Sequence, residues 1–171
     1  ILYPLDFTYP HYLFSYQCHV QKRKMPTHSE IKLMPYSAEQ MYSLVADIEN
    51  YSDFLPWCSA ARILRRMDEG DHEVVAADLV ISFKVFREKF GSRVVLWPEV
   101  LKIDTEYLNG PFKHMVSNWS FKNNEDGCEV TFFVDFEFKN LLLQKIIGVV
   151  FNEAMHRVVR AFEKRAEDLY A

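Results

Sequence analysis

The sequence predicts an α+β fold in which a curved antiparallel β-sheet wraps around a long C-terminal α-helix. Three observations support it: a run of strand-like segments separated by turn signals, a helical segment before that run, and a long amphipathic segment after it. Consecutive strands joined by tight turns form an antiparallel meander, and one face of such a sheet must be covered. The C-terminal helix is the obvious cover, and a curved sheet that grips one helix usually encloses a cavity.

The first predicted elements are a short strand and a helix. Residues 30–34 form the strand candidate, with Ile31 and Leu33 on one face. Ser37 is a good N-cap, and Gln40 completes a capping box. The helix that follows carries apolar side chains at helical spacing: Met41, Leu44, Val45 and Ile48.

The middle of the chain is predicted to be a meander of strands. Pro56 ends any helix that precedes it, because proline lacks the backbone donor that a helix needs. Asn109-Gly110 is a strong hairpin signal, and residues 129–138 alternate cleanly between apolar and polar. The predicted strands cover residues 61–67, 73–83, 90–97, 102–108, 112–121 and 129–138.

The last predicted element is a long helix that Asn140 caps. Its first part, residues 141–151, is apolar nearly all round, whereas charged residues fill much of its second half. An apolar stripe runs along the helix at three- and four-residue spacing: Leu143, Ile147, Phe151, Ala154, Met155, Val158, Phe162 and Leu169.

Composition narrows the class of protein. The chain has 171 residues, enough for one domain with a sizeable core. The net charge of −4 makes nucleic acid an unlikely partner. Only 5 glycines are present, which disfavours phosphate-binding loops, and the 3 widely spaced cysteines favour neither a disulfide framework nor a zinc site. Residues 1–26 differ in composition and are expected to be a poorly ordered extension, with Met25 as a candidate start.

A search for catalytic and metal-binding motifs finds none, and the six histidines do not pair at metal-ligand spacing. We therefore predict no catalytic residues and no metal site. Asp135 and Glu137 share a strand face and resemble an acid/base pair, but a solvated sheet face explains them more simply. Cys58 is a conceivable nucleophile, although packing is the favoured interpretation because no base is suggested nearby.

Two features leave alternatives open. Basic residues alternate with phenylalanines in residues 83–93, which fits a membrane surface, RNA binding or ordinary surface charge. Aromatic residues make up 15% of the chain, with 14 phenylalanines, and this surplus fits either a packed core or a cavity for a flexible apolar ligand. The segments 84–90 and 141–151 are candidates for membrane contact or for a cavity gate.

The residues also resemble a known family. The resemblance covers about residues 28–171 and points to the coenzyme Q-binding protein (COQ10) family of the START-like, polyketide cyclase/dehydrase superfamily. It rests on the following blocks: Tyr51-x-x-Phe54-Leu55-Pro56-Trp57-Cys58 with Arg62-Ile63, residues 83–94, Leu108-x-Gly110-Pro111-Phe112, Trp119-x-Phe121, residues 136–143, Phe151 and residues 161–166.

The resemblance implies a helix-grip fold over residues 27–171, with ubiquinone (coenzyme Q) or a related polyprenyl lipid bound in an apolar cavity. It implies a non-catalytic carrier or chaperone that supports respiration and ubiquinone biosynthesis, with ubiquinone as ligand and no other cofactor. Implied partners are a peripheral membrane surface and quinone-biosynthesis or respiratory proteins. The implied location is the cytoplasmic face of the bacterial inner membrane, or the mitochondrial inner membrane in a eukaryote.

Two alternatives remain open. Some bacterial relatives, of the RatA type, are described as toxins that block association of the ribosomal subunits. A cyclase-type enzyme would need a buried acid/base set, and Asp78 or Glu88 would be the first suspects. We predict that the cavity is lined by Phe54, Pro56, Trp57, Leu79, Ile81, Phe83, Phe86, Phe90, Phe112, Met115, Trp119, Leu143, Ile147, Phe151 and Met155.

Overall fold

The computed structural model describes residues 27–83 and 85–171, so the predicted extension at residues 1–26 lies outside the described residues. The elements follow one another as predicted, with strands, a short helical region, a meander and a long helix. Their bounds are β1 Thr27–Met34, α1 Ala38–Ala46, η1 Ile48–Asn50, α2 Tyr51–Phe54, β2 Cys58–Asp68, β3 Glu73–Phe83, β4 Phe86–Trp97, β5 Lys102–Asn109, β6 Phe112–Asn124, β7 Gly127–Phe138 and α3 Leu141–Tyr170.

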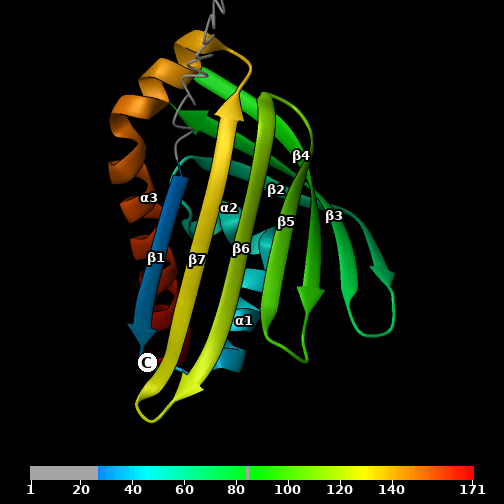
Figure 1. The fold of residues 1–171 in the computed structure, drawn as a ribbon, viewed down its shortest axis with the longest axis vertical. Coiled ribbons are helices and arrows are strands. Elements are labelled where there is room, and N and C mark those ends of the chain that lie inside the picture. Colours follow the sequence, from blue (N-terminus) through cyan, green and yellow to red (C-terminus); the bar gives the residue numbers. More distant parts are fainter. Residues whose placement is uncertain (1–26, 84) are drawn as a thin grey trace, which may run out of the picture.

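The sheet is one seven-stranded antiparallel layer in the order β1-β7-β6-β5-β4-β3-β2. It curves around α3, which runs along its concave side (Figure 1). The meander β2 to β7 is built from neighbours in sequence, while β1 joins the free edge of β7. The predicted helix-grip fold is therefore confirmed.

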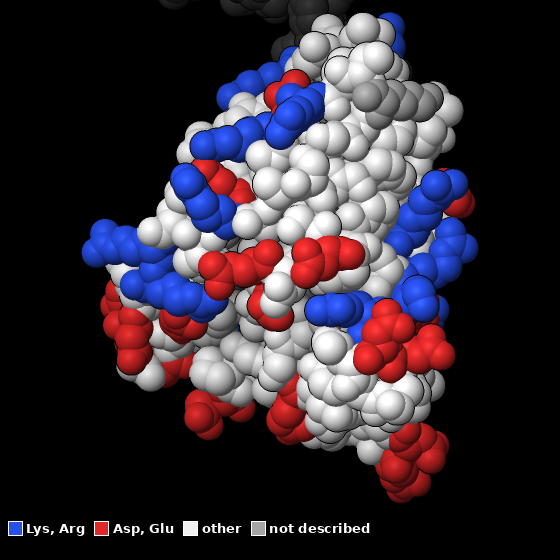
Figure 2. Space-filling view, turned by 180° about the vertical axis from the view of Figure 1, so that it is seen from behind, with Lys and Arg blue, Asp and Glu red and all other residues white. Residues whose placement is uncertain are grey.

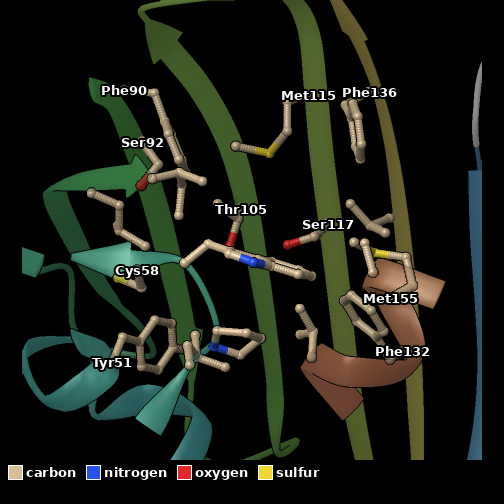
Figure 3. Close-up of a pocket in the computed structure, with 18 of the residues that line it drawn as sticks. Tyr51, Cys58, Phe90, Ser92, Thr105, Met115, Ser117, Phe132, Phe136 and Met155 are labelled. Carbon is tan, nitrogen blue, oxygen red and sulfur yellow. The ribbon is translucent and has the colours of Figure 1, made fainter. Parts of the chain in front are cut away.

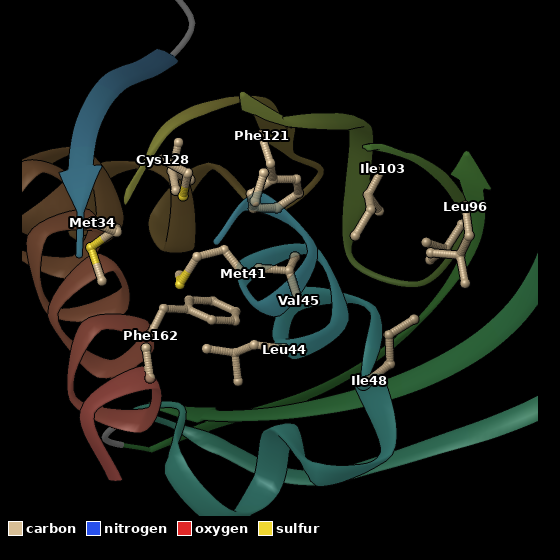
Figure 4. Packing of buried hydrophobic residues seen from close by; sticks show 14 of the residues in the cluster. Met34, Met41, Leu44, Val45, Ile48, Leu96, Ile103, Phe121, Cys128 and Phe162 are labelled. Carbon is tan, nitrogen blue, oxygen red and sulfur yellow. The ribbon is translucent and has the colours of Figure 1, made fainter. Parts of the chain in front are cut away.

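The helix α1 closes one end of the sheet, and its start is the predicted capping box. The backbone N–H of Gln40 donates to Ser37 Oγ at 3.2 Å, and the Ser37 N–H donates to Gln40 Oε1 at 2.9 Å. The apolar face of α1 packs against the C-terminal part of α3 and the end of the sheet, where Met41 and Leu44 lie close to Phe162 (Figure 4). This cluster forms the main core and fixes one end of the concave space.

The edge strand β1 carries its apolar residues on the side away from α3. Ile31 and Leu33 share a face, as predicted, but they are 64% and 69% exposed. The opposite face meets α3 through polar contacts: Lys32 Nζ lies 2.6 Å from Glu163 Oε1, and Glu30 Oε2 lies 3.9 Å from His156 Nδ1. The seam between β1 and α3 is therefore partly ionic.

The long helix α3 starts at the predicted cap. Asn140 Oδ1 accepts hydrogen bonds from the N–H groups of Leu142 and Leu143 at 2.9 and 3.1 Å. Gln144 ties this first turn to the sheet, because its Oε1 accepts from the Phe138 N–H at 2.8 Å. Among the described residues, no helix has the length and apolar character needed to cross a bilayer.

Candidate ligand-binding cavity

A cavity of about 300 Å³ lies between the concave face of the sheet and α3. This volume is at the lower end of the range for small-molecule sites, roughly 300–1,000 Å³. The walls come from β2 to β7, from the α1–α2 region, and from α3 between Ile147 and Phe162. The curvature of the sheet holds its inner side chains apart from the helix, which is why the apolar surplus does not pack solid.

Most of the predicted cavity residues line this space. Figure 3 shows Phe90 and Met115 on the sheet side and Met155 on α3, all pointing inward. The predicted residues that line the cavity are Pro56, Trp57, Leu79, Ile81, Phe83, Phe90, Phe112, Met115, Trp119, Ile147 and Met155.

The other predicted residues lie beside the cavity, in the packed core. Phe54 is enclosed by the rings of Tyr51 and Phe162, at centroid distances of 5.9 and 5.2 Å. Phe151 is 5% exposed and packs on Phe136, with ring centroids 5.3 Å apart. Leu143 belongs to the same buried cluster as Phe151, and Phe86 is half-buried and packs against that cluster.

Several lining residues were missed by the sequence-based prediction. Most of them come from β7, from the α1–α2 region and from α3, and the alternation of residues 129–138 was a usable signal for the β7 members. The missed residues are Val45, Ile48, Tyr51, Leu55, Cys58, Ser92, Val94, Ile103, Thr105, Ser117, Phe132, Val134, Phe136, Phe138, Val150, Ala154, Val158 and Phe162.

The cavity wall carries no charged side chain among the described residues. Its polar groups are hydroxyls, one thiol and two indoles. Burial raises the pKa of the Cys58 thiol and of the Tyr51 phenol, so both groups are neutral at pH 7. The Tyr51 hydroxyl also donates to the backbone carbonyl of Val45. The site therefore suits a neutral ligand.

Aromatic rings form a large part of the wall. The Trp119 indole stacks on Phe132 at a centroid distance of 4.1 Å, and Phe90 meets Phe112 edge-to-face at 5.3 Å. Such faces and edges are well suited to a flat conjugated ring or an unsaturated chain. Methionine side chains between them can adapt to an irregular ligand.

Trp57, which lines the cavity, has an unusual backbone conformation. Its φ of 64° lies in the left-handed region, which is strained for a bulky residue. The strand pairing holds it there, because the Trp57 carbonyl accepts a hydrogen bond from the Ser82 N–H at 2.7 Å. Its ring contacts Phe83 edge-to-face at 5.4 Å. The turn after Pro56 thus fixes an indole at the cavity wall.

The carboxylates considered as acid/base candidates lie outside the cavity wall. On β7, Asp135 Oδ2 is 3.2 Å from His114 Nε2, and Glu137 Oε1 is 2.7 Å from Lys113 Nζ. Asp78 Oδ2 pairs with Lys89 Nζ at 2.7 Å, and neither Asp78 nor Glu88 lines the cavity. No group of His, Cys, Asp and Glu suited to a metal ion occurs within the described residues.

A sheet that grips one long helix over an apolar cavity defines a class of small lipid-binding domains. The chain belongs to the family described as polyketide cyclase/dehydrase and lipid transport, whose model matches residues 34–163.

The similar proteins include some that are named as toxins and one that is named for coenzyme Q binding. The ribosome association toxin RatA of Rickettsia prowazekii is 39% identical over 141 residues, which cover 81% of this chain and 94% of that protein. The mitochondrial coenzyme Q-binding protein COQ10 homolog B of Xenopus laevis is 34% identical over 148 residues, which cover 84% of this chain and 59% of that protein. The solution structure of an 18 kDa protein from Caulobacter crescentus is 32% identical, with a TM-score of 0.72 over 85% of this chain and 99% of that one.

Proposed function

We propose that the chain binds ubiquinone or a related polyprenyl lipid in the cavity and releases it chemically unchanged. The observation that carries this proposal is the apolar cavity under α3, lined by aromatic rings and methionines and without a charged side chain among the described residues. A coenzyme Q-binding relative at 34% identity supports the same ligand class. General acid/base catalysis works best with a group that titrates near neutral pH against the ligand. Burial raises the pKa of the two titratable lining groups, Cys58 and Tyr51, and the carboxylates Asp78 and Glu88 lie elsewhere.

The cavity is too small for a long polyprenyl chain, so the quinone ring and the first part of the tail are the portion we expect it to hold. Burying one methylene from water gains about 0.8 kcal/mol, but a polyprenyl lipid already resides in a bilayer. Transfer from bilayer to cavity therefore gains almost nothing by burial. The protein is best suited to work at the membrane surface, presenting quinone to biosynthetic or respiratory enzymes.

One end of the molecule fits such a surface, the end where α3 begins and where the β3–β4 and β5–β6 turns lie (Figure 1). We call it the apical end. Its exposed apolar residues are Val85, Leu108, Leu141, Leu142 and Val149. Its exposed basic residues are Arg87, Lys89, Lys113, Lys139 and Lys145.

Lipid-facing apolar side chains flanked by basic ones are typical of proteins that dock on anionic membranes. In Figure 2 the upper half of the molecule has a broad uncharged area with Lys and Arg on both sides. The cavity reaches toward this end through Phe112, Phe138 and Ile147. We therefore place the ligand entrance at the apical end, against the inner bacterial membrane or its mitochondrial counterpart.

The first test is a solvent extract of freshly purified protein, examined for quinones by mass spectrometry. We expect stoichiometric ubiquinone, and quenching of tryptophan fluorescence when decylubiquinone is added to protein stripped of lipid. Trp57 and Trp119 line the cavity, whereas Trp97 donates through Nε1 to Asp104 away from it. Trp97→Phe should leave the quenching amplitude intact, and Trp119→Phe should reduce it.

An empty extract, from protein that also fails to take up decylubiquinone, would overturn the proposal. Conversion of the bound quinone to a new product would overturn its non-catalytic part. Mass spectrometry of the extract and the uptake of decylubiquinone are measured on the same protein sample, so the two results can be compared directly.

Association with the ribosome is the second candidate function. The observation that favours it is the likeness to a relative named as a ribosome association toxin, which is higher in identity and more complete in coverage than the likeness to the coenzyme Q-binding relative. Such binding would use the outer surface and would weaken with salt, since ribosomal RNA is a polyanion. Co-sedimentation with ribosomal subunits at low and high salt tests it, and migration apart from the subunits at low salt would exclude it.

A further inference from the structure

The sheet side of the cavity has a pair of hydroxyl groups on neighbouring strands. Thr105 of β5 and Ser117 of β6 are directly opposite in the register, and both line the cavity. Residues paired in this way have Cβ atoms roughly 4.5–5.5 Å apart, so their hydroxyls can reach a common atom. Figure 3 shows both side-chain oxygens on the cavity side of the sheet, below Met115 and Phe90.

These two hydroxyls differ from the others on the cavity wall because neither makes a hydrogen bond with any part of the chain that the structure describes. The Ser92 hydroxyl donates to the Ala77 carbonyl at 3.4 Å, and the Tyr51 hydroxyl donates to the Val45 carbonyl. A purely hydrocarbon ligand would bury Thr105 and Ser117 with their hydrogen bonds unmade, which is unfavourable. A ligand with an oxygen acceptor at this point would satisfy them.

We propose that Thr105 and Ser117 form a head-group subsite that donates hydrogen bonds to a carbonyl oxygen of a neutral, flat ring such as a benzoquinone. This inference rests on the proposed function and adds the position and chemistry of the head. The tail then runs from the subsite toward the apical end, along Phe90, Phe112 and Phe138.

The same wall excludes charged head groups. No lysine, arginine or histidine lines the described cavity, so a carboxylate or phosphate placed beside Thr105 and Ser117 would lose its hydration without gaining a counter-charge. Fatty acids and phospholipids are therefore disfavoured in this orientation. The subsite selects neutral lipids with a carbonyl or hydroxyl head.

The test compares two probes that share a ten-carbon tail, decylubiquinone and decylbenzene, on the double variant Thr105→Val and Ser117→Ala. Valine keeps the shape of threonine, so the variant removes donors without opening much space. We expect the affinity for decylubiquinone to fall at least tenfold and the affinity for decylbenzene to stay equal or to rise. Ser120→Ala is the matched control, because Ser120 lies on β6 between Lys102 and Thr131 and does not line the cavity.

A second measurement is independent of affinity. The carbonyl stretching band of bound decylubiquinone should lie at a lower wavenumber in the wild type than in the double variant, because hydrogen bonding weakens the C=O bond. Unchanged affinity and an unchanged band in the double variant would overturn the subsite while leaving quinone binding in place. Palmitate binding as tight as decylubiquinone would overturn the selection of neutral heads, and failure of the wild type to bind any quinone would instead overturn the proposed function.

Discussion

Cys58 illustrates how its surroundings decide the chemistry of a single side chain. It lines the cavity and is 6% exposed, and burial raises its thiol pKa. A raised pKa lowers the fraction of thiolate at neutral pH, and the thiolate is the nucleophile. The thiol is therefore expected to be a packing group, in agreement with the interpretation that its sequence neighbours favoured.

Chemical labelling checks this expectation. In a Cys18→Ser, Cys128→Ser background, Cys58 should react slowly with Ellman's reagent at pH 7.5. Its rate should still increase above pH ~8.5, the ordinary pKa of a free thiol, because the titration lies higher. Saturating decylubiquinone should slow the reaction further by filling the cavity. A rate equal to that of free cysteine at pH 7.5, unaffected by ligand, would contradict both the burial and the cavity position.

Met155 provides a sharper test of the cavity than Phe151, although the sequence predicted both as lining residues. Met155→Glu places a carboxylate in a wall without a described counter-charge, so quinone affinity should fall at least tenfold. Asn152→Glu, exposed on the same helix, should leave affinity unchanged and control for the added charge. Fluorescence titration with decylubiquinone measures both variants. Equal affinities would remove α3 from the binding site.

The sequence could predict which side chains are apolar and which face of the helix they share. It could not predict which residues of that face border the cavity and which pack against the sheet. Phe151 and Met155 are one helical turn apart and were indistinguishable by periodicity. The curvature of the sheet determines that Phe151 packs on Phe136, whereas Met155 lines the cavity. The contribution of Val45 and Ile48 was missed for a similar reason, since α1 reaches the cavity through tertiary packing.

At the scale of elements, local signals predicted the caps and the meander, while the edges of the sheet needed tertiary information. The strand β1 alternates cleanly, yet its inner face is the polar one, because α3 offers it charged partners such as Glu163 for Lys32. The strand β4 starts at Phe86, earlier than predicted, since Phe86 pairs with Phe83. Most of the segment 84–90, a candidate for membrane contact or for a cavity gate, therefore belongs to the sheet.

Asn140 caps the start of α3, and Gln144 adds a second contact to the first turn. Asn140→Ala removes the acceptor for the N–H groups of Leu142 and Leu143, which should cost about 1 kcal/mol and lower the melting temperature by about 2–4 °C. Hydrogen exchange of those two amides should accelerate more than exchange in α1. Asn152→Ala in the exposed middle of α3 is the control and should not destabilise the protein. An unchanged melting temperature and unchanged exchange in Asn140→Ala would show that Gln144 alone fixes the helix start.

At the scale of the whole molecule, charge is separated along the long axis although the net charge is only −4. Basic residues surround the apical end. The opposite end carries exposed acidic residues in or next to the β2–β3, β4–β5 and β6–β7 turns: Asp68, Glu69, Asp71, Glu99, Glu125 and Asp126. An anionic surface would therefore attract one end and repel the other, which orients the cavity entrance toward the lipid. The net charge taken from the sequence conceals this separation, because only the fold assigns each residue to an end.

Vesicle binding tests this orientation. Wild-type protein should bind vesicles containing phosphatidylglycerol in preference to neutral ones, and less at 0.5 M than at 0.05 M salt because screening shortens the range of the attraction. Each basic residue near an anionic surface is worth about 1 kcal/mol, so Arg87→Glu with Lys145→Glu should weaken binding by at least about tenfold. Lys102→Glu with Lys122→Glu gives the same net charge at the opposite end and should bind nearly as the wild type does.

The apolar part of the docking surface is separable from the charge. Val149 is 87% exposed and Leu142 is 61% exposed, so replacing both with serine should leave the fold intact and weaken vesicle binding even in high salt. Co-sedimentation with vesicles at both salt concentrations measures the charged and the apolar contributions in one series.

If the Arg87/Lys145 and the Lys102/Lys122 charge-reversal variants lost binding equally, attraction would follow net charge and the apical end would have no special role. If the serine variant bound as tightly as the wild type, docking would be electrostatic only, and lipid exchange at the cavity entrance would need another route.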